Sequence, residues 1–291
     1  MVEPLTLAAQ ITINGILFGS IYSMVALGLN LIFGTMKIVF LAQGTITILG
    51  AYTAFWLFNL FGVDPFISML VIFPLFFVLG IASYYGIFHR ALKIGPNPTL
   101  LASFGLLIIV QTAMAVAWTA NPRGIYPSYA SLVFSLGDVH VPFIRIIALV
   151  FCVVVTAVLL VVLKKTMLGK AIRATSEDPE AASLMGINVS KINCIAFSIG
   201  IILAGLAGLI LGTIYSFDPY LGLLLTLKGF VALTIGGLGS TVGALVGGLI
   251  LGVIESTTAF LVGAGWSDFA SYTAFLVILL IKPYGIFGKK W

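Results

Sequence analysis

This sequence contains few charged residues. Lys and Arg number 14 and Asp and Glu nine among 291 residues, so charged residues make up 8% of the chain, against roughly 25% in a soluble domain. Hydrophobic residues make up 61%, in recurring runs of about 20 residues that can each cross a hydrocarbon core. The alternating segments of about ten residues that build a membrane β-barrel are absent. The chain is therefore predicted to be a polytopic helical membrane protein.

The sequence also contains only two cysteines and two histidines. Cys152 and Cys194 fall in or near apolar runs, so we expect two buried hydrophobes and neither a disulfide framework nor a metal site. No Ser-His-Asp set, paired carboxylates or phosphate-binding G-x-x-x-x-G-K-[ST] motif occurs. We expect no catalytic residue, no cofactor and no ATP site in this chain itself. The net charge of +5 comes from basic residues in loops expected to flank the membrane, where they determine topology. No nucleic-acid partner is therefore expected.

The apolar runs predict an all-α transmembrane bundle of eight or nine spans. The seventh run is short and glycine-rich, so we expect a short, broken or re-entrant helix there. No second domain is indicated, so residues 1–291 are treated as a single transmembrane domain. The runs lie near 7–33, 38–60, 66–88, 99–119, 143–163, 192–214, 225–238, 242–262 and 267–282.

The loops between these runs sort by charge. If all nine runs cross, one set of loops carries 11 of the 14 basic residues, which predicts that this set is cytoplasmic, the N-terminus outside and the C-terminus inside. The longest cytoplasmic loop is then about 164–191. The basic set is Lys37, Arg90, Lys93, Lys164, Lys165, Lys170, Arg173, Lys191, Lys282, Lys289 and Lys290. The opposite set holds Glu3, Asp64, Asp138, Asp218 and Asp268, with only Arg123 and Arg145 as bases.

The stretch EDPEAASLMG (177–186) lies in that longest loop and predicts a short helix. Asp178 suits the N-cap, Pro179 the first helical position and Gly186 a left-handed end. Acids at the start also favour the helix dipole. So short a helix is marginal in water, so a partner is expected to hold it; a turn lying on lipid headgroups is the alternative. The candidate docking residues are Glu177, Asp178, Glu180, Ala181, Ala182, Leu184, Met185 and Gly186.

EAASLMG has the spacing E-A-A-x-x-x-G and resembles the docking loop of ABC-importer permeases. The wider stretch MLGKAIRATSEDPEAASLMGIN (167–188) resembles that of the LivH-type permeases of branched-chain amino acid importers. NGILFGSIYSMVALGLNLIFG (14–34), ILGAYTA (48–54), LKGFVALTIGGLGSTVGALVGGLILGVIES (227–256) and ILLIKPYGIFG (278–288) resemble further segments of that family. The resemblance covers almost the whole chain, in order.

The resemblance implies a permease subunit in a bacterial or archaeal cytoplasmic membrane. Its implied partners are a second permease chain, LivM-type or a second copy, two ATP-binding subunits docked on 177–186, an extracytoplasmic substrate-binding protein and membrane lipid. Family members usually read close to N-F-A-H-G-E after the first span. This chain has VFLAQGT (39–45), with Gln43 in the His position and Thr45 in the Glu position. The transported solute therefore stays open.

Several polar residues fall inside apolar runs. Lys228 and Glu255 are both expected in the outer half of the membrane, where an unpaired charge is costly, so they either pair or line the translocation path. Gln43, Thr45 and Thr47 lie in the glycine-flanked segment LAQGTITILG (41–50), where unwound backbone could meet a small polar solute. Five glycines form a small-xxx-small stripe expected to pack helices closely: Gly239, Gly243, Gly247, Gly248 and Gly252.

The function indicated is a pore subunit of an ABC importer for branched-chain amino acids or related small polar solutes. One alternative keeps this architecture and imports urea or short amides. The other is an ion-coupled secondary carrier, which needs coupling groups at mid-membrane. Glu255 is the only acid that we expect to be buried and available for this role, and such a carrier has no use for a docking helix.

Overall fold

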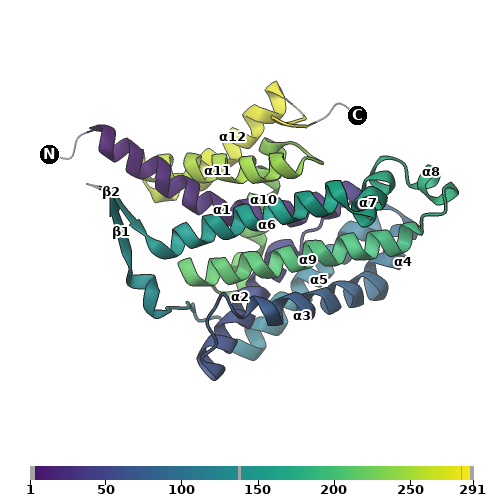
Figure 1. Ribbon diagram of the computed structural model, residues 1–291, viewed down its shortest axis with the longest axis horizontal. Helices are drawn as coiled ribbons and strands as arrows, with labels where there is room; N and C mark the ends of the chain where they lie inside the picture. The colour runs from purple at the N-terminus through teal and green to yellow at the C-terminus, as the bar shows by residue number, and fades with distance from the viewer. Residues whose placement is uncertain (1–3, 137–138, 283, 289–291) are drawn as a thin grey trace.

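The computed structural model describes residues 4–136, 139–282 and 284–288, and over this part of the chain the protein is a helical bundle (Figure 1). Nine of its helical segments are long and apolar enough to cross a membrane, as the apolar runs predict. Glu3, Asp138, Lys289 and Lys290 lie outside the described residues, so their contribution to the charge pattern stays a prediction.

The elements follow one another with short connections. Helix α3 continues through a π-helical turn, Tyr84–Phe88, into α4, so these segments form one span. A small hairpin, β1–β2, joins α5 to α6 and was not expected from the sequence. The helices are α1 (Pro4–Met36), α2 (Gln43–Phe61), α3 (Met69–Ser83), α4 (His89–Ile94), α5 (Pro96–Trp118), α6 (Phe143–Lys165), α7 (Met167–Glu177), α8 (Pro179–Leu184), α9 (Val189–Ile214), α10 (Gly222–Gly236), α11 (Thr241–Leu261) and α12 (Ser267–Ile281), and the strands are β1 (Val133–Leu136) and β2 (Val139–Pro142).

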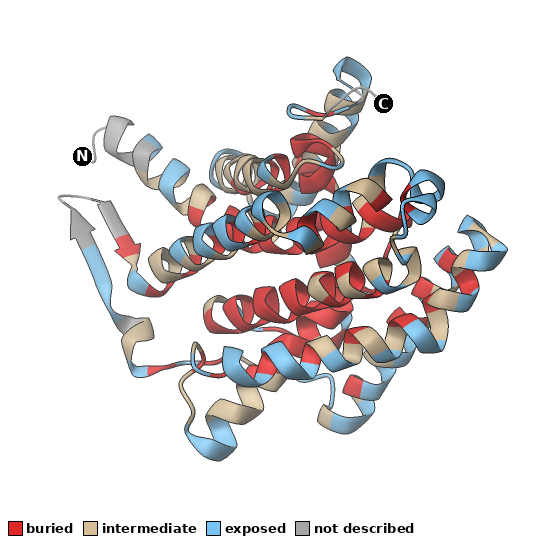
Figure 2. Cartoon of the chain, turned by 45° about the vertical axis from the view of Figure 1, so that its right-hand side comes forward, coloured by how far each residue is buried: buried red, intermediate tan, exposed pale blue. Residues whose placement is uncertain are grey.

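Helices α1 and α9 form the centre of the bundle. α1 packs against α11, α9, α10 and α6, and α9 packs against α2, α1 and α3. Figure 2 shows the buried residues concentrated on the central helices and the exposed ones on the periphery. Peripheral helices expose large apolar side chains such as Leu70, Val158 and Leu280. An outer surface of this kind suits lipid tails, which are as apolar as the side chains themselves.

The two ends of the bundle differ. Figure 1 shows α4, α7 and α8 at one end and the β1–β2 hairpin at the other. Arg90 and Lys93 lie in α4, and Lys170 and Arg173 lie in α7. These four bases, which the sequence assigns to one set of loops, therefore share one end of the molecule, which we call the basic end.

Helix α2 begins deep inside the bundle. α1 ends at Met36 at the basic end, and residues 37–42 then run without helix back into the interior. The Gln43 side-chain amide donates to the Gly200 carbonyl at 3.3 Å. Gly200 is eleven residues into α9, or about 17 Å from its start at 1.5 Å per residue, so α2 begins near the middle of a core about 30 Å thick. The apolar run near 38–60 thus contains a span, but its helix begins five residues later, at Gln43.

Helix α10 also begins near mid-depth, where its first turn crosses that of α2. Cα of Gly222 is so close to Thr45 that a Cβ on Gly222 would lie 2.5 Å from Thr45 Oγ1. A 3₁₀ turn, Pro219–Leu221, leads into this short helix. The glycine-rich seventh run is therefore a short helix, as predicted, and it is continuous from Gly222 to Gly236.

Within the non-helical segment 37–42, side chains from two other helices partner the backbone of Leu41. Leu41 N donates to Ser103 Oγ of α5 at 2.6 Å. Thr226 Oγ1 of α10 donates to Leu41 O at 2.9 Å and accepts from Gly44 N at 2.8 Å. Irregular backbone at membrane depth is tolerated only where protein or water supplies such partners.

Candidate functional site

The predicted docking segment forms α8 as a capped, six-residue helix. The Asp178 carboxylate oxygen Oδ1 accepts from the backbone N–H groups of Glu180 at 2.9 Å and Ala181 at 3.0 Å. Pro179 occupies the first helical position. Gly186 has φ +84°, a left-handed conformation that glycine adopts at little cost. The local structure predicted from EDPEAASLMG is confirmed.

The side chains of α8 point mostly into solvent. Leu184 is 87% exposed and Met185 is 84% exposed, whereas Ala182 is buried. Glu177, Asp178, Glu180, Ala181 and Gly186 are also exposed. Two adjacent apolar side chains so exposed at the end of a short helix offer an anchor for another protein.

Helix α7 attaches α8 to the bundle, and the sequence pattern did not single it out. Thr166 caps its start by accepting from Gly169 N at 3.0 Å. On the side of α7 that faces the bundle, Ile172 and Thr175 are buried. Ser176 Oγ donates to Gly34 O of α1 at 2.6 Å, and Arg173 donates to Leu163 O of α6. The sequence signal that could have revealed it is the helical spacing of the apolar residues Leu168, Ala171 and Ile172 in MLGKAIRATSE. A force on α8 would therefore reach α1 and α6 through α7.

Lys228 of α10 lies in an ionic cluster with Glu255 of α11 and Asp268 of α12. Its Nζ is 2.9 Å from Glu255 Oε1 and 2.9 Å from Asp268 Oδ1. The Lys228 and Glu255 side chains are 10% and 13% exposed, and that of Asp268 is 52% exposed. The two charges inside apolar runs therefore form the ion pair that the sequence left as one of two possibilities. Its part in a translocation path stays a prediction.

Two hydroxyl groups also donate hydrogen bonds to the Glu255 carboxylate. Tyr22 of α1 donates to Glu255 Oε2 at 2.6 Å, and Ser271 of α12 donates to Oε1 at 2.8 Å. Asp268 and Ser271 were not predicted, because the sequence places them beside an outer loop. The cluster connects α1, α10, α11 and α12 in the half of the bundle away from the basic end. Because a buried charge that loses its partner is strongly destabilising, each charge in the cluster depends on the others.

Gln43, Thr45 and Thr47 are completely buried in this chain. They lie in the first two turns of α2 and not on the unwound backbone, which ends just before Gln43. The side-chain oxygens of Gln43 and Thr45 have no hydrogen-bond partner among the described residues. Thr47 Oγ1 donates to Gln43 O at 3.0 Å. These three residues have no surface that a solute could reach without movement of α2 or α10, so their place in a path stays a prediction.

The glycine stripe brings helix backbones together, with one exception. A Cβ on Gly247 would lie 2.1 Å from Ala232 O of α10. A Cβ on Gly248 would meet Ser23 N at 2.3 Å, and one on Gly252 would meet Gly15 O at 2.2 Å, both on α1. Gly243 has the same relationship to Gly236 O, at 2.4 Å. The exception is Gly239, which lies in the loop before α11 with φ +82° and so packs no helix.

Other candidate chemistry is not assembled in the described residues. They contain no group of three His, Cys, Asp or Glu side chains that could hold a metal ion. Cys152 and Cys194 are both buried and free, as predicted.

Nine apolar spans, two helices that start at mid-depth and a helical arm exposed at one end define a polytopic membrane permease subunit. The family model described as branched-chain amino acid transport system / permease component matches residues 11–281. The chain belongs to this family.

Full-length relatives support this assignment. The chain is 31% identical to the high-affinity branched-chain amino acid transport system permease protein BraD of Pseudomonas aeruginosa, over 96% of this chain and 95% of BraD. It is 28% identical to LivH of Escherichia coli K12, over 95% of this chain and 94% of LivH. It is 30% identical to a probable LivH of Methanocaldococcus jannaschii, over 96% of this chain and 92% of that protein.

A solved structure shares the fold. PsaBC from Streptococcus pneumoniae, in complex with Fab, superposes with a TM-score of 0.50 over 93% of this chain and 91% of that chain. The sequences are 16% identical, so the likeness concerns the arrangement of helices alone.

Proposed function

We propose that this chain is one of the two membrane-spanning subunits of an ABC importer that carries branched-chain amino acids into the cell. The observation that carries the proposal is α8, a capped helix with Leu184 and Met185 exposed at the basic end. A second permease chain, LivM-type or another copy, encloses the path with it. A soluble binding protein delivers the solute from outside.

ATP hydrolysis belongs to two partner subunits that dock on α8. Closure of that pair moves α8, and α7 carries the movement to α1 and α6 through the Ser176–Gly34 and Arg173–Leu163 hydrogen bonds. The permease subunits then change between outward-facing and inward-facing states. The chain itself is not an enzyme, because its part is to form the path.

The orientation follows from the charges. Cytoplasmic loops of membrane proteins carry an excess of Lys and Arg, which favours the basic end, with α4, α7 and α8, on the cytoplasmic side. This is also where ATP is available to the partner subunits. The ionic cluster around Lys228 then lies in the outer half of the cytoplasmic membrane.

The solute is inferred from the relatives. Those that match over almost their whole length at about 30% identity are named for branched-chain amino acids. A permease named for autoinducer 2 import matches at 27% identity and over 71% of its length. Leucine is therefore the first solute to test, with urea and short amides as the alternative within the same class.

The test is ATP-driven uptake in vesicles that contain this chain, its second permease and the ATPase subunits, with the binding protein added outside. We expect leucine uptake that requires ATP inside. Leu184→Asp/Met185→Asp should abolish uptake and co-purification of the ATPase, whereas Ile94→Asp, at an exposed apolar residue of α4, should leave both intact. Concentration of leucine by this chain alone under an ion gradient would identify a secondary carrier and overturn the proposal. Uptake of urea instead would change only the solute.

A further inference from the structure

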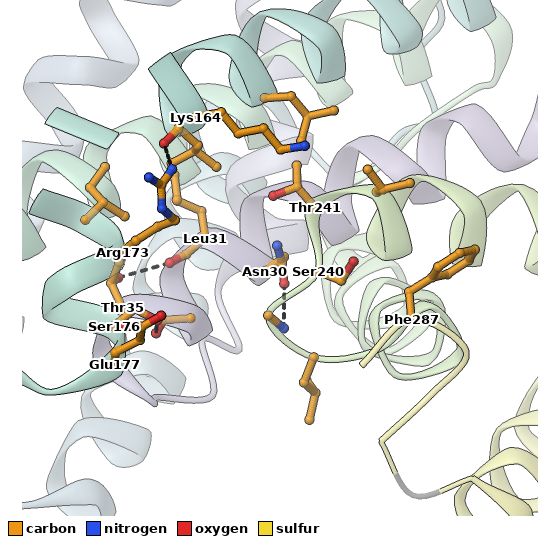
Figure 3. A pocket seen from close by; sticks show the side chains of 17 residues that line it. Asn30, Leu31, Thr35, Lys164, Arg173, Ser176, Glu177, Ser240, Thr241 and Phe287 are labelled. Atoms are coloured by element: carbon orange, nitrogen blue, oxygen red, sulfur yellow. Dashed lines mark hydrogen bonds between the residues drawn. The ribbon is translucent and has the colours of Figure 1, made fainter. Parts of the chain in front are cut away.

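A pocket of about 620 Å³ opens at the basic end between α1, α6, α7 and the start of α11 (Figure 3). Several lining residues lie at the ends of helices. Gly34 and Thr35 lie within one turn of the end of α1, and Lys164 lies one residue before the end of α6. Thr241 is the first residue of α11. The pocket therefore lies where the spans leave the apolar core, at the depth of lipid headgroups.

One side of the pocket suits an anion. Lys164 and Arg173 line it, and Glu177 is the only acidic lining residue. Figure 3 shows Lys164 extended from α6 toward Thr241. Ser240 caps α11 by accepting from Gly243 N at 3.0 Å, and the first N–H groups of a helix have no partner within the helix. The positive end of the α11 dipole thus adds to the field of the two cations.

A buried amide group also faces this space. Asn30 is 6% exposed, and its Oδ1 accepts from Gly239 N at 2.9 Å. Its side-chain nitrogen has no acceptor among the described residues and points into the pocket (Figure 3). The Asn30 amide can therefore donate to an oxygen atom of a molecule bound in the pocket.

The other side of the pocket is apolar. Leu160 and Leu163 of α6 line it, with Phe287 of the C-terminal segment opposite. The adjoining face of α6 exposes Val154, Val158 and Val161. An occupant with an anionic head and an apolar tail could place the head at the basic side and lay the tail along α6.

We propose that this pocket binds the phosphate headgroup of an anionic phospholipid. Arg173 and Lys164 pair with the phosphate, Asn30 and the first turn of α11 donate to its oxygens, and the acyl chains lie on the valine face of α6. Guanidinium groups match phosphate geometry, and basic pockets between transmembrane helices on the cytoplasmic side bind such headgroups. The same phosphate chemistry is available from soluble phosphate esters, so the experiment separates the two sources.

The bound lipid connects α7 to α11. Arg173, Ser176 and Glu177 of α7 line the pocket, and α8 begins two residues after Glu177. An occupied pocket therefore holds the arm that carries α8 against the bundle. Binding itself requires no partner subunit, so it is tested independently of the proposed transport function.

The test uses the purified full chain in detergent, with native mass spectrometry and thermal melting during titration with phosphatidylglycerol, phosphatidylcholine, sn-glycerol 3-phosphate or inorganic phosphate. We expect retained phosphatidylglycerol and a higher melting temperature, with little effect from the other three. Arg173→Gln and Lys164→Gln should each weaken phosphatidylglycerol binding about tenfold. Lys170→Gln, which removes an exposed charge from α7 outside the pocket, should bind like the unaltered chain.

A second variant fills the pocket without changing charge. A Cβ at Gly34 meets no atom within 4 Å, so Gly34→Leu should occupy the space and weaken binding about tenfold. Gly105→Leu, at a glycine of α5 with equally open surroundings, is the matched control. Unaltered lipid binding in Arg173→Gln and Gly34→Leu would overturn the site, and an equal shift with soluble phosphate would overturn the lipid assignment. Should Gly34→Leu fail to fold, the two charge variants decide.

Discussion

The hydroxyl oxygen of Thr226 lies 2.8 Å from the backbone nitrogen of Gly44, although the two residues are 182 positions apart in the sequence. The same hydroxyl donates to Leu41 O at 2.9 Å. One side chain thus joins the start of α10 to the start of α2, because it partners a backbone group of the first turn of α2 and one of the non-helical segment. Thr226 is completely buried, so bulk solvent cannot take over these hydrogen bonds.

Thr226→Val keeps the shape of the side chain and removes both hydrogen bonds. We expect a loss of stability of about 1–3 kcal/mol for each backbone group left unpaired, measured by thermal melting of the purified chain. Thr156→Val is the control, because Thr156 is equally buried and its hydroxyl donates only to Cys152 O in its own helix. Equal losses in the two variants would mean that Gly44 and Leu41 find other partners.

Lys228→Met should destabilise the chain by about 3–5 kcal/mol, because it leaves the Glu255 carboxylate buried without its cation. Adding Glu255→Gln removes the unpaired charge, so the double variant should be more stable than Lys228→Met. The measurement is a double-mutant cycle of melting temperatures. Lys191→Met, at an exposed base that starts α9, should change stability little. Strict additivity of the two substitutions would show that the 2.9 Å contact contributes no coupling energy.

Gly252→Ala should separate α1 from α11. The added Cβ would lie 2.2 Å from Gly15 O and 2.4 Å from Gly19 N, and backbone atoms cannot move aside as side chains do. We expect a low yield of folded protein and a melting temperature lowered by several degrees. Gly86→Ala, where a Cβ meets no atom within 4 Å, should fold normally. Normal folding of both variants would contradict the close packing of α1 on α11.

Gly186→Val should impair docking of the ATPase without preventing membrane insertion. A β-branched residue at φ +84° is strained by about 1–2 kcal/mol, which shifts the end of α8 and the exposed Leu184 and Met185 beside it. The readouts are co-purification of the ATPase and the amount of chain in the membrane. Gly263→Val imposes similar strain at φ +117° in the loop before α12 and should dock normally. Loss of insertion in Gly186→Val would assign the segment a structural role.

Much of the fold could be predicted because its signals are local. Run length determines how many helices can cross a hydrocarbon core, and the nine spans follow from it. The Asp178 cap, the Pro179 start and the left-handed Gly186 depend on neighbours within a few positions, so α8 was also predictable residue by residue. The run near 66–88 shows the limit of this reasoning, because the helical span continues past the end of the run to Ile94.

The depth of α2 was not predictable from hydropathy. Residues 37–42 are apolar enough to read as helix, yet they are unwound because Ser103 and Thr226 supply partners for the backbone of Leu41. The Gln43, Thr45 and Thr47 side chains are consequently buried against α9 and α10. A residue's hydropathy indicates that it lies in the membrane and not which neighbour it contacts there.

By itself, the sequence determined the membrane class, the positions of the apolar runs and the form of α8. Each of these depends on composition or on residues close together in the chain. Only the tertiary structure decided that Asp268 joins Lys228 and Glu255, that α2 and α10 meet at mid-depth, and that Lys164, Arg173 and Asn30 surround one pocket. These arrangements depend on which helix faces pack together, and that is set by close contacts between residues far apart in the sequence.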